Sequence, residues 1–220
     1  MKNTPIRAVL FDFGGVITTS PFEAFHRFER ERGLPDAFIQ GINRSNADDN
    51  AWARFERGEL TAEAFDEAFA REARAAGHDV RGLEVVELVY GQVRPRMVQA
   101  VQRCRGRFIT ACLTNNFRNR EALTAATDPA SGTARDREWR DALALFDQVI
   151  ESSKIGARKP EKAFFELACN RLSIEPAEAV FLDDLGTNLK PARLMGMRTI
   201  KVTDPDAALA ELGNLLGMEL

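Results

Sequence analysis

Residues 9–16 read VLFDFGGV and place an aspartate and two glycines directly after an apolar run. The run covers residues 7–11 and shows no clean alternation of polar and apolar side chains. This pattern is typical of a strand that is covered on both faces, as in a parallel sheet. The glycines after Asp12 allow backbone amides to approach a ligand closely. The stretch therefore predicts a buried strand with a carboxylate at its carboxyl end.

Similar apolar segments recur along the rest of the chain. We expect strands in four of them, the last being the weakest: 108–113, 179–182, 199–202 and 148–150. Helical patterns lie between the strands, with Gly196 placed to end the last of them: 95–105, 160–171 and 187–194. Strands that alternate with helices favour an α/β fold with a doubly wound parallel sheet.

Residues 20–91 break this alternation and predict an all-helical insertion. Aromatic side chains recur at helical spacing in three of its segments: 21–32, 51–57 and 62–76. We expect most of these aromatics to form the core of a small helical bundle and some to line a pocket. Because the insertion follows the first strand directly, it would cover that strand's carboxyl end as a cap. The expected organisation is a core domain of residues 1–19 and 92–220 with a helical cap of residues 20–91.

Composition and charge exclude several classes of protein. The 220 residues carry 30 Lys and Arg against 33 Asp and Glu, a net charge of −3, so we expect no nucleic-acid partner. A membrane span needs about 20 apolar residues in a row, whereas uncharged stretches here are no longer than 108–117. With no signal-peptide layout at the N-terminus, we expect a soluble, cytoplasmic protein without a membrane partner; its oligomeric state stays open. Segment 135–141 (RDREWRD) is expected to be a solvated face, and 130–134 a surface loop.

Cysteine and histidine usage excludes further classes. Cys104, Cys112 and Cys169 are odd in number and far apart, which excludes a disulfide framework and a zinc site of the usual spacing. Their apolar neighbours predict buried, inert thiols. His26 and His78 are the two histidines that a catalytic triad or metal site could use. The motifs of dinucleotide, P-loop, serine-hydrolase and zinc-protease chemistry are missing from the sequence.

Polar residues follow three of the predicted strands. The strands end at Asp12, at Thr114 with Asn115, and at Asp183 with Asp184. Ligands bind at the carboxyl ends of strands in open parallel sheets, so these side chains are expected to converge on one crevice. A purely stabilising role at three strand ends is the alternative. The hydroxyl and backbone amides of Thr114 and Asn115 suit phosphate oxygens, with turn formation as their simpler role.

The residue types at these positions indicate phosphoryl chemistry with a metal ion. An aspartate such as Asp12 can attack phosphorus and form an aspartyl-phosphate, although Asp before Gly-Gly is also ordinary turn chemistry. The adjacent carboxylates of Asp183 and Asp184 repel each other unless a cation such as Mg²⁺ binds them, although one of them could cap a helix. Lys159 precedes Pro160, which suits the first position of a helix. Its ammonium could meet the same phosphate or face solvent.

Four segments together resemble the motifs of the haloacid dehalogenase superfamily. They read FDFGGVI at 11–17, LTNN at 113–116, GARKP at 156–160 and FLDDLGTNLKPAR at 181–193. The stretch 182–202 is especially similar to the N-terminal phosphatase domain of soluble epoxide hydrolases and to related bacterial sugar-phosphate phosphatases. The resemblance covers nearly the whole chain. It implies a Rossmann-like core with a helical cap and a Mg²⁺-dependent phosphatase acting on a small phosphorylated metabolite: a sugar, acyl or lipid phosphate.

The same resemblance implies roles for individual residues. It makes Asp12 the nucleophile, and it assigns phosphate binding to Thr114, Asn115 and Lys159. The implied Mg²⁺ ligands are Asp12, the main-chain carbonyl of Gly14 and Asp184, while Asp183 and Asn188 would orient metal-bound water.

One position departs from the phosphatase pattern. Most phosphatases of this superfamily carry a general acid and base two residues after the nucleophile, where this chain has Gly14. Such help is worth roughly 10²–10⁴ in rate, or about 3–5 kcal/mol. The related sugar-phosphate phosphatases also have glycine there, and a good leaving group such as an acyl phosphate would suffer least. His26 and Glu23 are candidate substitutes for the acid, against the simpler view that they are exposed helix residues.

Two alternatives remain at this point. Dehalogenases of the superfamily also lack the second aspartate, but they do not depend on Mg²⁺ and do not carry paired aspartates at the last motif. Asp183 and Asp184 therefore favour phosphoryl chemistry. The other alternative rests on Gly14, which lacks a side chain for acid–base catalysis. It is a catalytically impaired protein that binds a phosphorylated ligand or partner without turnover. The sequence leaves the substrate open.

Overall fold

A five-stranded parallel sheet forms the centre of the computed structural model, which describes residues 4–117 and 133–220. The strands in chain order are β1 Ala8–Phe11, β2 Ile109–Thr114, β3 Gln148–Glu151, β4 Ala179–Asp183 and β5 Arg198–Lys201. Their spatial order is β3-β2-β1-β4-β5, so β1 lies in the middle, with Ala8 opposite Ile109 on one side and Ala179 on the other. The α/β fold and all five predicted strands are confirmed, with ends that differ by about one residue.

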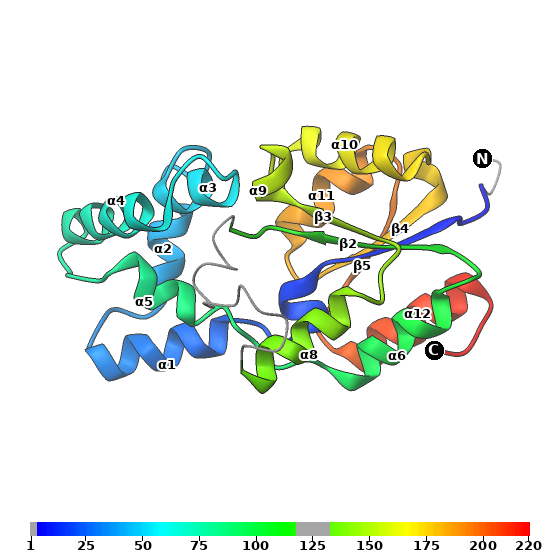
Figure 1. Ribbon diagram of the computed structural model, residues 1–220, viewed down its shortest axis with the longest axis horizontal. Coiled ribbons are helices and arrows are strands. Elements are labelled where there is room, and N and C mark those ends of the chain that lie inside the picture. The colour runs from blue at the N-terminus through cyan, green and yellow to red at the C-terminus, as the bar shows by residue number, and fades with distance from the viewer. Residues whose placement is uncertain (1–3, 118–132) are drawn as a thin grey trace.

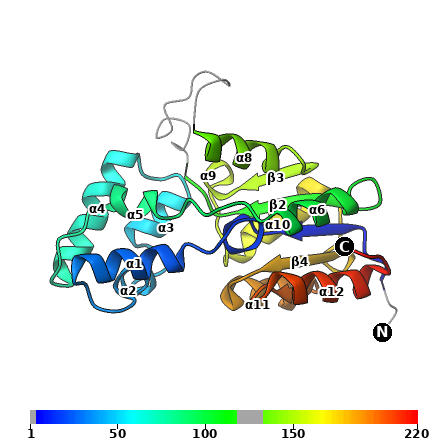
Figure 2. The same cartoon turned by 90° about the horizontal axis from the view of Figure 1, so that it is seen from below.

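Helices cover both faces of the sheet (Figures 1 and 2). One face packs against α6 Pro95–Cys104, α8 Ala134–Leu143 and α12 Pro205–Leu216, and the other against α9 Ser152–Ile155, α10 Lys162–Leu172 and α11 Gly186–Leu194. Val9 and Phe11 enter the first of these two cores, whereas Ala8 and Leu10 enter the second. Because both faces are buried, β1 needs apolar residues at every position, which explains its unbroken apolar run.

The helical insertion lies at the carboxyl ends of the strands, on the left of Figure 1. It contains α1 Phe22–Arg32, α2 Phe38–Arg44, α3 Ala51–Glu56, α4 Ala62–Ala75 and α5 Gly82–Glu87. Thr61 begins α4 as its cap, since its hydroxyl accepts a hydrogen bond from the Ala64 amide. The two linkers to the cap run side by side, with Thr19 N donating to Gln92 O at 2.8 Å. The predicted division of the chain at residues 20 and 91 stays a prediction.

The cap has an apolar core of its own, as the aromatic spacing predicts. The Phe55 ring stacks on Phe65, with centroids 4.2 Å apart, and on Phe117, with centroids 4.5 Å apart. Phe117 follows β2 and therefore belongs to the core part of the chain, yet it packs among the cap aromatics. The two parts of the molecule thus share a hydrophobic contact next to the strand ends.

The prediction for residues 135–141 is partly wrong. The capping pair Thr133 and Asp136 begins α8, and its other charged residues are exposed, but Trp139 is only 6% exposed. The Trp139 indole donates to the Gly91 carbonyl at 2.9 Å, and its ring meets Phe13 edge-on. Trp139 is the largest of the apolar side chains that dock α8, and Ala142 and Leu143 join it in the same core. Of the predicted loop 130–134, residues 130–132 lie outside the described residues, and Ala134 is already helical.

Two further expectations can be compared with the structure. Pro160 does not open a helix: its peptide bond with Lys159 is cis, and α10 begins at Lys162. The three cysteines are buried and form no disulfide with one another, and burial raises the pKa of Cys104 to about 11, as inert thiols require. Throughout residues 4–117 and 133–220, helices are too short or too polar to cross a membrane.

Candidate active site

Asp12 sits at the point where the central strand gives way to a tight helical turn. Its amide donates to the Leu182 carbonyl at 2.8 Å, which prolongs the pairing with β4 by one residue. The turn covers Phe13–Ile17, with Gly14 extended and Gly15 left-handed at φ +79°. The Phe13 amide donates to Asp12 Oδ1 at 2.6 Å and fixes the carboxylate at the strand end. The glycines thus let the chain turn sharply while Asp12 faces the strand-end crevice.

Lys159 bridges two carboxylates at this point. Its Nζ lies 2.7 Å from Asp12 Oδ1 and 2.9 Å from Asp183 Oδ2, and the side chain is 1% exposed. Burial raises the pKa of Asp12, and the Lys159 ammonium opposes this rise. Burial lowers the pKa of Lys159, but the charges of Asp12 and Asp183 outweigh it and hold that pKa above its usual range. The buried cation and its two anionic partners stabilise one another's charges.

Asp183 accepts hydrogen bonds from several neighbouring groups and holds them in position. Its Oδ1 accepts from the Leu185 amide at 2.8 Å, and Asn188 Nδ2 donates to both of its oxygens at 3.1 and 3.0 Å. With Lys159 on Oδ2, this fully buried carboxylate is surrounded by donors. The family resemblance implies that Asp183 and Asn188 orient metal-bound water; the hydrogen bonds between these two residues were not predicted.

A cluster of three carboxylates is suited to a divalent cation. Oxygens of Asp12, Asp183 and Asp184 lie within 4.8 Å of one another. Burial, followed by repulsion from Asp183, raises the pKa of Asp184 to about 6. A Cβ added to Gly15 would lie 2.2 Å from Asp184 Oδ2, so only glycine lets the turn approach this carboxylate so closely. Carboxylate oxygens are the hard ligands that Mg²⁺ prefers, and a bound cation would relieve the repulsion between them. The cluster therefore fits Mg²⁺.

Thr114 and Asn115 end β2 beside the same cluster. Asn115 clamps the main chain of Lys159: its Oδ1 accepts from Lys159 N at 2.9 Å, and its Nδ2 donates to Lys159 O at 3.0 Å. The Asn115 side chain therefore holds the lysine in place, and a phosphate would be left to the backbone amide. Its Nδ2 also donates to Glu56 of the cap at 3.1 Å.

A cavity of about 180 Å³ opens over these residues. The polar floor consists of Asp12, Lys159, Asp183, Asp184 and Asn188, of which all but Asp183 line the cavity. The apolar wall consists of Phe22, Trp52, Tyr90, Phe117 and Leu143. The cavity's described lining includes neither His26 nor Glu23: the first has a half-exposed side chain beside Glu29, and the second lines a separate hollow. The two candidate substitutes for the missing acid are therefore not placed to serve.

The chain belongs to the family of haloacid dehalogenase-like hydrolases, whose model matches residues 6–196. It is 38% identical to acyl-CoA dehydrogenase family member 10 of Mus musculus over 97% of its length, which is 19% of that protein. It is 32% identical to bifunctional epoxide hydrolase 2 of Sus scrofa over 98% of its length and 40% of that protein. The chain thus spans two fifths or less of these two relatives. A sesquiterpene phosphatase of Aspergillus oryzae is 26% identical, with 97% of this chain and 98% of that protein covered.

Solved structures support the fold. A predicted HAD-like hydrolase from Porphyromonas gingivalis matches with a TM-score of 0.68 at 21% identity, covering 96% of this chain and 98% of that one. A HAD family enzyme from Bacteroides thetaiotaomicron, in complex with magnesium and inorganic phosphate, matches with a TM-score of 0.58 at 18% identity, covering 89% and 93%. The family resemblance drawn from the four motifs is confirmed.

Sequence reasoning missed several residues beside the site. Glu56, Arg158 and Ser152 all lie at the boundary between cap and core. Arg158 adjoins Lys159 in the GARKP motif, and this proximity is a signal for a role at the site. Glu56 carries no comparable signal, because nothing in a cap helix's sequence says which of its faces meets the core.

Proposed function

We propose that this chain is a Mg²⁺-dependent phosphatase that hydrolyses a small phosphorylated metabolite through a phosphorylated Asp12. The observation that carries the proposal is the position of the Asp12 carboxylate: one oxygen lies 2.7 Å from the Lys159 ammonium, and one lies within 4.8 Å of an Asp184 oxygen. A nucleophilic carboxylate must approach an anionic phosphate, and the Lys159 ammonium on one side with a Mg²⁺ held by Asp184 on the other would make that approach possible.

The reaction would take place in two displacements. A carboxylate oxygen of Asp12 attacks phosphorus, the bond from phosphorus to the ester oxygen breaks, and the alcohol or acid leaves with a proton from solvent. Water then attacks the phosphorus of the aspartyl-phosphate, which releases inorganic phosphate and restores the carboxylate. Bound at Asp12, Asp184 and the Gly14 carbonyl, Mg²⁺ would neutralise the charge that gathers on the phosphoryl oxygens.

Lys159, Thr114 and Asn115 would bind and orient the phosphoryl group. Lys159 is held between Asp12 and Asp183, so its charge is fixed beside the nucleophile rather than moved there during the reaction. The Thr114 hydroxyl and the Asn115 backbone amide would donate to phosphoryl oxygens. Asp183 and Asn188 would hold Lys159 and the metal-bound water in position.

The apolar wall favours a substrate whose organic part is itself apolar. Phe22, Trp52, Tyr90 and Phe117 offer ring surface to the cavity that holds Asp12. Rings next to a polar floor suit a molecule with a phosphate at one end and a hydrocarbon at the other. Among sugar, acyl and lipid phosphates we therefore favour a lipid-like phosphate, and the likeness to the sesquiterpene phosphatase supports this choice.

Gly14 supports a second candidate, a protein that binds a phosphorylated ligand without turning it over. An acid at this position is worth roughly 10²–10⁴ in rate, and His26 and Glu23 are not placed to replace it. The two functions share one binding site and differ only in whether phosphate is released.

Phosphate release separates the two candidates. The test measures release from acyl, sugar and lipid phosphates, with and without Mg²⁺, by the wild-type protein, Asp12→Asn and the exposed control Asp206→Asn. We expect release that requires both Mg²⁺ and Asp12, that Asp206→Asn retains, and that is fastest with lipid phosphates. No release from any substrate, in a protein that still binds inorganic phosphate with Mg²⁺, would establish the binding role instead. Release that persists in Asp12→Asn would exclude the aspartyl-phosphate route.

A further inference from the structure

Glu56, the last residue of α3, is a buried carboxylate of the cap that faces the core rather than solvent. Its side chain is 8% exposed and accepts three hydrogen bonds. Trp52 Nε1 donates to Oε1 at 2.9 Å from within the cap. Asn115 Nδ2 at 3.1 Å and Arg158 Nε at 2.5 Å both donate to Oε2 from the core. One carboxylate oxygen thus joins two separate loops of the core.

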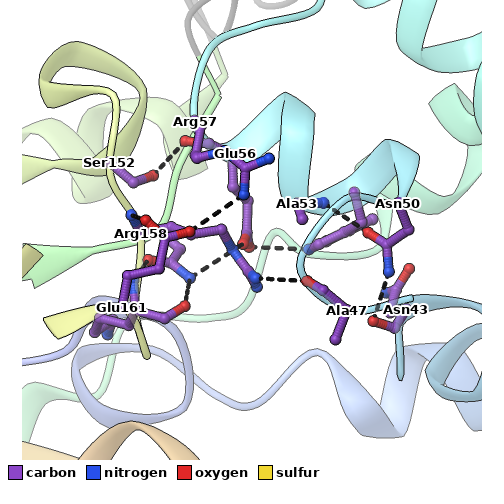
Figure 3. A network of polar contacts seen from close by, with 12 residues as sticks. Asn43, Ala47, Asn50, Ala53, Glu56, Arg57, Ser152, Arg158 and Glu161 are labelled. Carbon is purple, nitrogen blue, oxygen red and sulfur yellow. Dashed lines mark hydrogen bonds and ion pairs between the residues drawn. The ribbon is translucent and has the colours of Figure 1, made fainter. Parts of the chain in front are cut away.

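The surrounding contacts hold this junction closed (Figure 3). The Ser152 hydroxyl donates to the Glu56 carbonyl at 2.6 Å. Arg57 of the cap pairs with Glu161 of the core at 3.2 Å, which reverses the charges of the Glu56–Arg158 pair. Each side of the boundary therefore contributes one acid and one base, so that a displaced cap would lose both pairs together.

The loop before α3 adds a second layer to the junction. Asn50 donates to the carbonyls of Asn43 and Ser45 at 2.8 and 2.9 Å, and its Oδ1 caps α3 at Ala53. The loop shaped in this way presents the Ala47 carbonyl to Arg158, whose Nη1 donates to it at 3.2 Å. The Arg158 guanidinium is thus held by the cap at two places.

The core partners of Glu56 lead directly to the polar floor. Asn115 makes two hydrogen bonds with the main chain of Lys159, and Arg158 is the residue before it. The Lys159 ammonium in turn lies 2.7 Å from Asp12. Glu56 therefore restrains the lysine from both sides, through a side-chain clamp and through the adjoining peptide.

We propose that Glu56 is a positioning residue for the reaction: by holding Asn115 and Arg158, it presents Lys159 to the phosphoryl group only while the cap is docked on the core. The inference rests on the phosphatase function proposed above. Without the carboxylate, the Asn115 amide and the Arg158 guanidinium lose a shared acceptor in a place that water reaches poorly. Glu56→Gln keeps the size of the side chain but turns one acceptor into a donor that faces other donors.

The test measures binding of inorganic phosphate to the Mg²⁺-loaded protein by calorimetry, together with kcat and KM. A misplacement of about 1 Å at a reacting group can cost about 10²-fold in rate, so we expect Glu56→Gln to lower kcat roughly 10–100-fold. We expect phosphate affinity to fall about tenfold, equivalent to about 1.4 kcal/mol, and KM to change less than kcat. Glu67→Gln, an exposed change on α4, is the matched control and should leave all three values unchanged.

A double-mutant cycle separates positioning from simple support of the cap. In an Asn115→Ala background, the effect of Glu56→Gln on phosphate affinity should fall well below tenfold, because the part of it that acts through the Asn115 contact is already lost and only the part through Arg158 remains. An equal loss in both backgrounds, or wild-type affinity in a folded Glu56→Gln protein, would overturn the proposal. Should Glu56→Gln not fold, Arg158→Gln takes its place in the cycle with the same expectation. A wild-type protein that binds phosphate but does not release it would refute the phosphatase and leave this affinity test intact.

Discussion

The polar floor and the apolar wall of the cavity are held in place by different forces. On the floor, Lys159 and Asp183 each meet two or more polar partners at hydrogen-bond distance, and both are almost fully buried. On the wall, Trp52 meets Phe117 edge-on at 5.4 Å, and Phe22 meets Phe25 in the same way at 6.1 Å. Directional contacts fix the floor to one geometry, whereas ring contacts tolerate changes of shape. The comparison suggests that the floor determines the reaction and the wall determines the substrate.

Among changes to the polar floor, removal of Lys159 should cause the largest loss of stability and activity. Lys159→Met leaves Asp12 and Asp183 as buried carboxylates without their shared cation, and breaking a buried ion pair from one side costs about 3–5 kcal/mol. We expect a loss of that size in the free energy of unfolding measured with urea, and a fall in turnover of more than about 10³-fold. Lys162→Met, which removes an exposed lysine paired with Glu166, should cost less than about 1 kcal/mol. Similar losses in the two variants would show that the floor is not held by charge.

An acid introduced at position 14 should raise the rate of the reaction on the polar floor and leave the contacts of the apolar wall unchanged. A Cβ on Gly14 would meet no other atom of the described residues within 4 Å, and its backbone is extended at φ −70°, so Gly14→Asp should fold. We expect kcat for alkyl phosphates to rise up to about 10²-fold, because the new carboxyl can protonate the leaving oxygen. Acyl phosphates, whose leaving group needs no proton, serve as the control and should gain little. An equal gain for both substrate types would mean that leaving-group protonation does not limit the rate.

Shortening the wall should change binding and leave the chemistry intact. Phe22→Ala removes a half-buried ring at the start of α1 that lines the cavity. For a lipid-like phosphate we expect KM to rise about tenfold, a value typical of lost apolar contact in a binding pocket, with kcat nearly unchanged. Acetyl phosphate, which is too small to reach the wall, should show no change. A tenfold loss with acetyl phosphate as well would place Phe22 in the catalytic geometry and contradict the division between floor and wall.

The sequence predicted the floor far better than the wall. Asp12, Asp183 and Asp184 each follow an apolar run, as Thr114 does beside them, and parallel strands bring their carboxyl ends to one edge of the sheet. Lys159 does not follow a strand: the sequence left open whether its ammonium meets the phosphate or faces solvent, and the family resemblance favoured phosphate binding.

The residues of the cap could not be placed in the same way. Trp52 and Glu56 share a face of α3, since they are four residues apart, but the helical period does not say whether that face meets the core, the cap or solvent. Trp139 was missed for a related reason: it is the only large apolar side chain among the charges of residues 135–141, too little for a helical period to show. The docking of the cap on the core determines which of these helix faces are buried. That docking depends on the whole fold.

The smallest expected effect concerns the response of the floor to pH. The pKa of Asp184 is raised to about 6 from its ordinary 3.8, chiefly by burial. Between these values the folded, metal-free protein holds its proton more strongly than the unfolded chain does, so the contribution of Asp184 to stability falls as pH rises through 6. Mg²⁺ needs the ionised carboxylate, so the Tm gained on adding Mg²⁺ should grow by roughly 3–6 °C from pH 5 to pH 7.5.

Thermal unfolding with Mg²⁺ or EDTA across this range tests the pH response, with Asp206→Asn as a control that should behave like the wild type. Asp184→Asn should remove most of the pH-dependent part of the gain, because it removes both the titrating group and a metal ligand. Phe22→Ala should retain that part in full, since the apolar wall carries no charge to titrate. A gain that is flat with pH in the wild type, or a pH dependence altered equally by the wall variant, would mean that charge and packing are not divided between floor and wall as the contacts indicate.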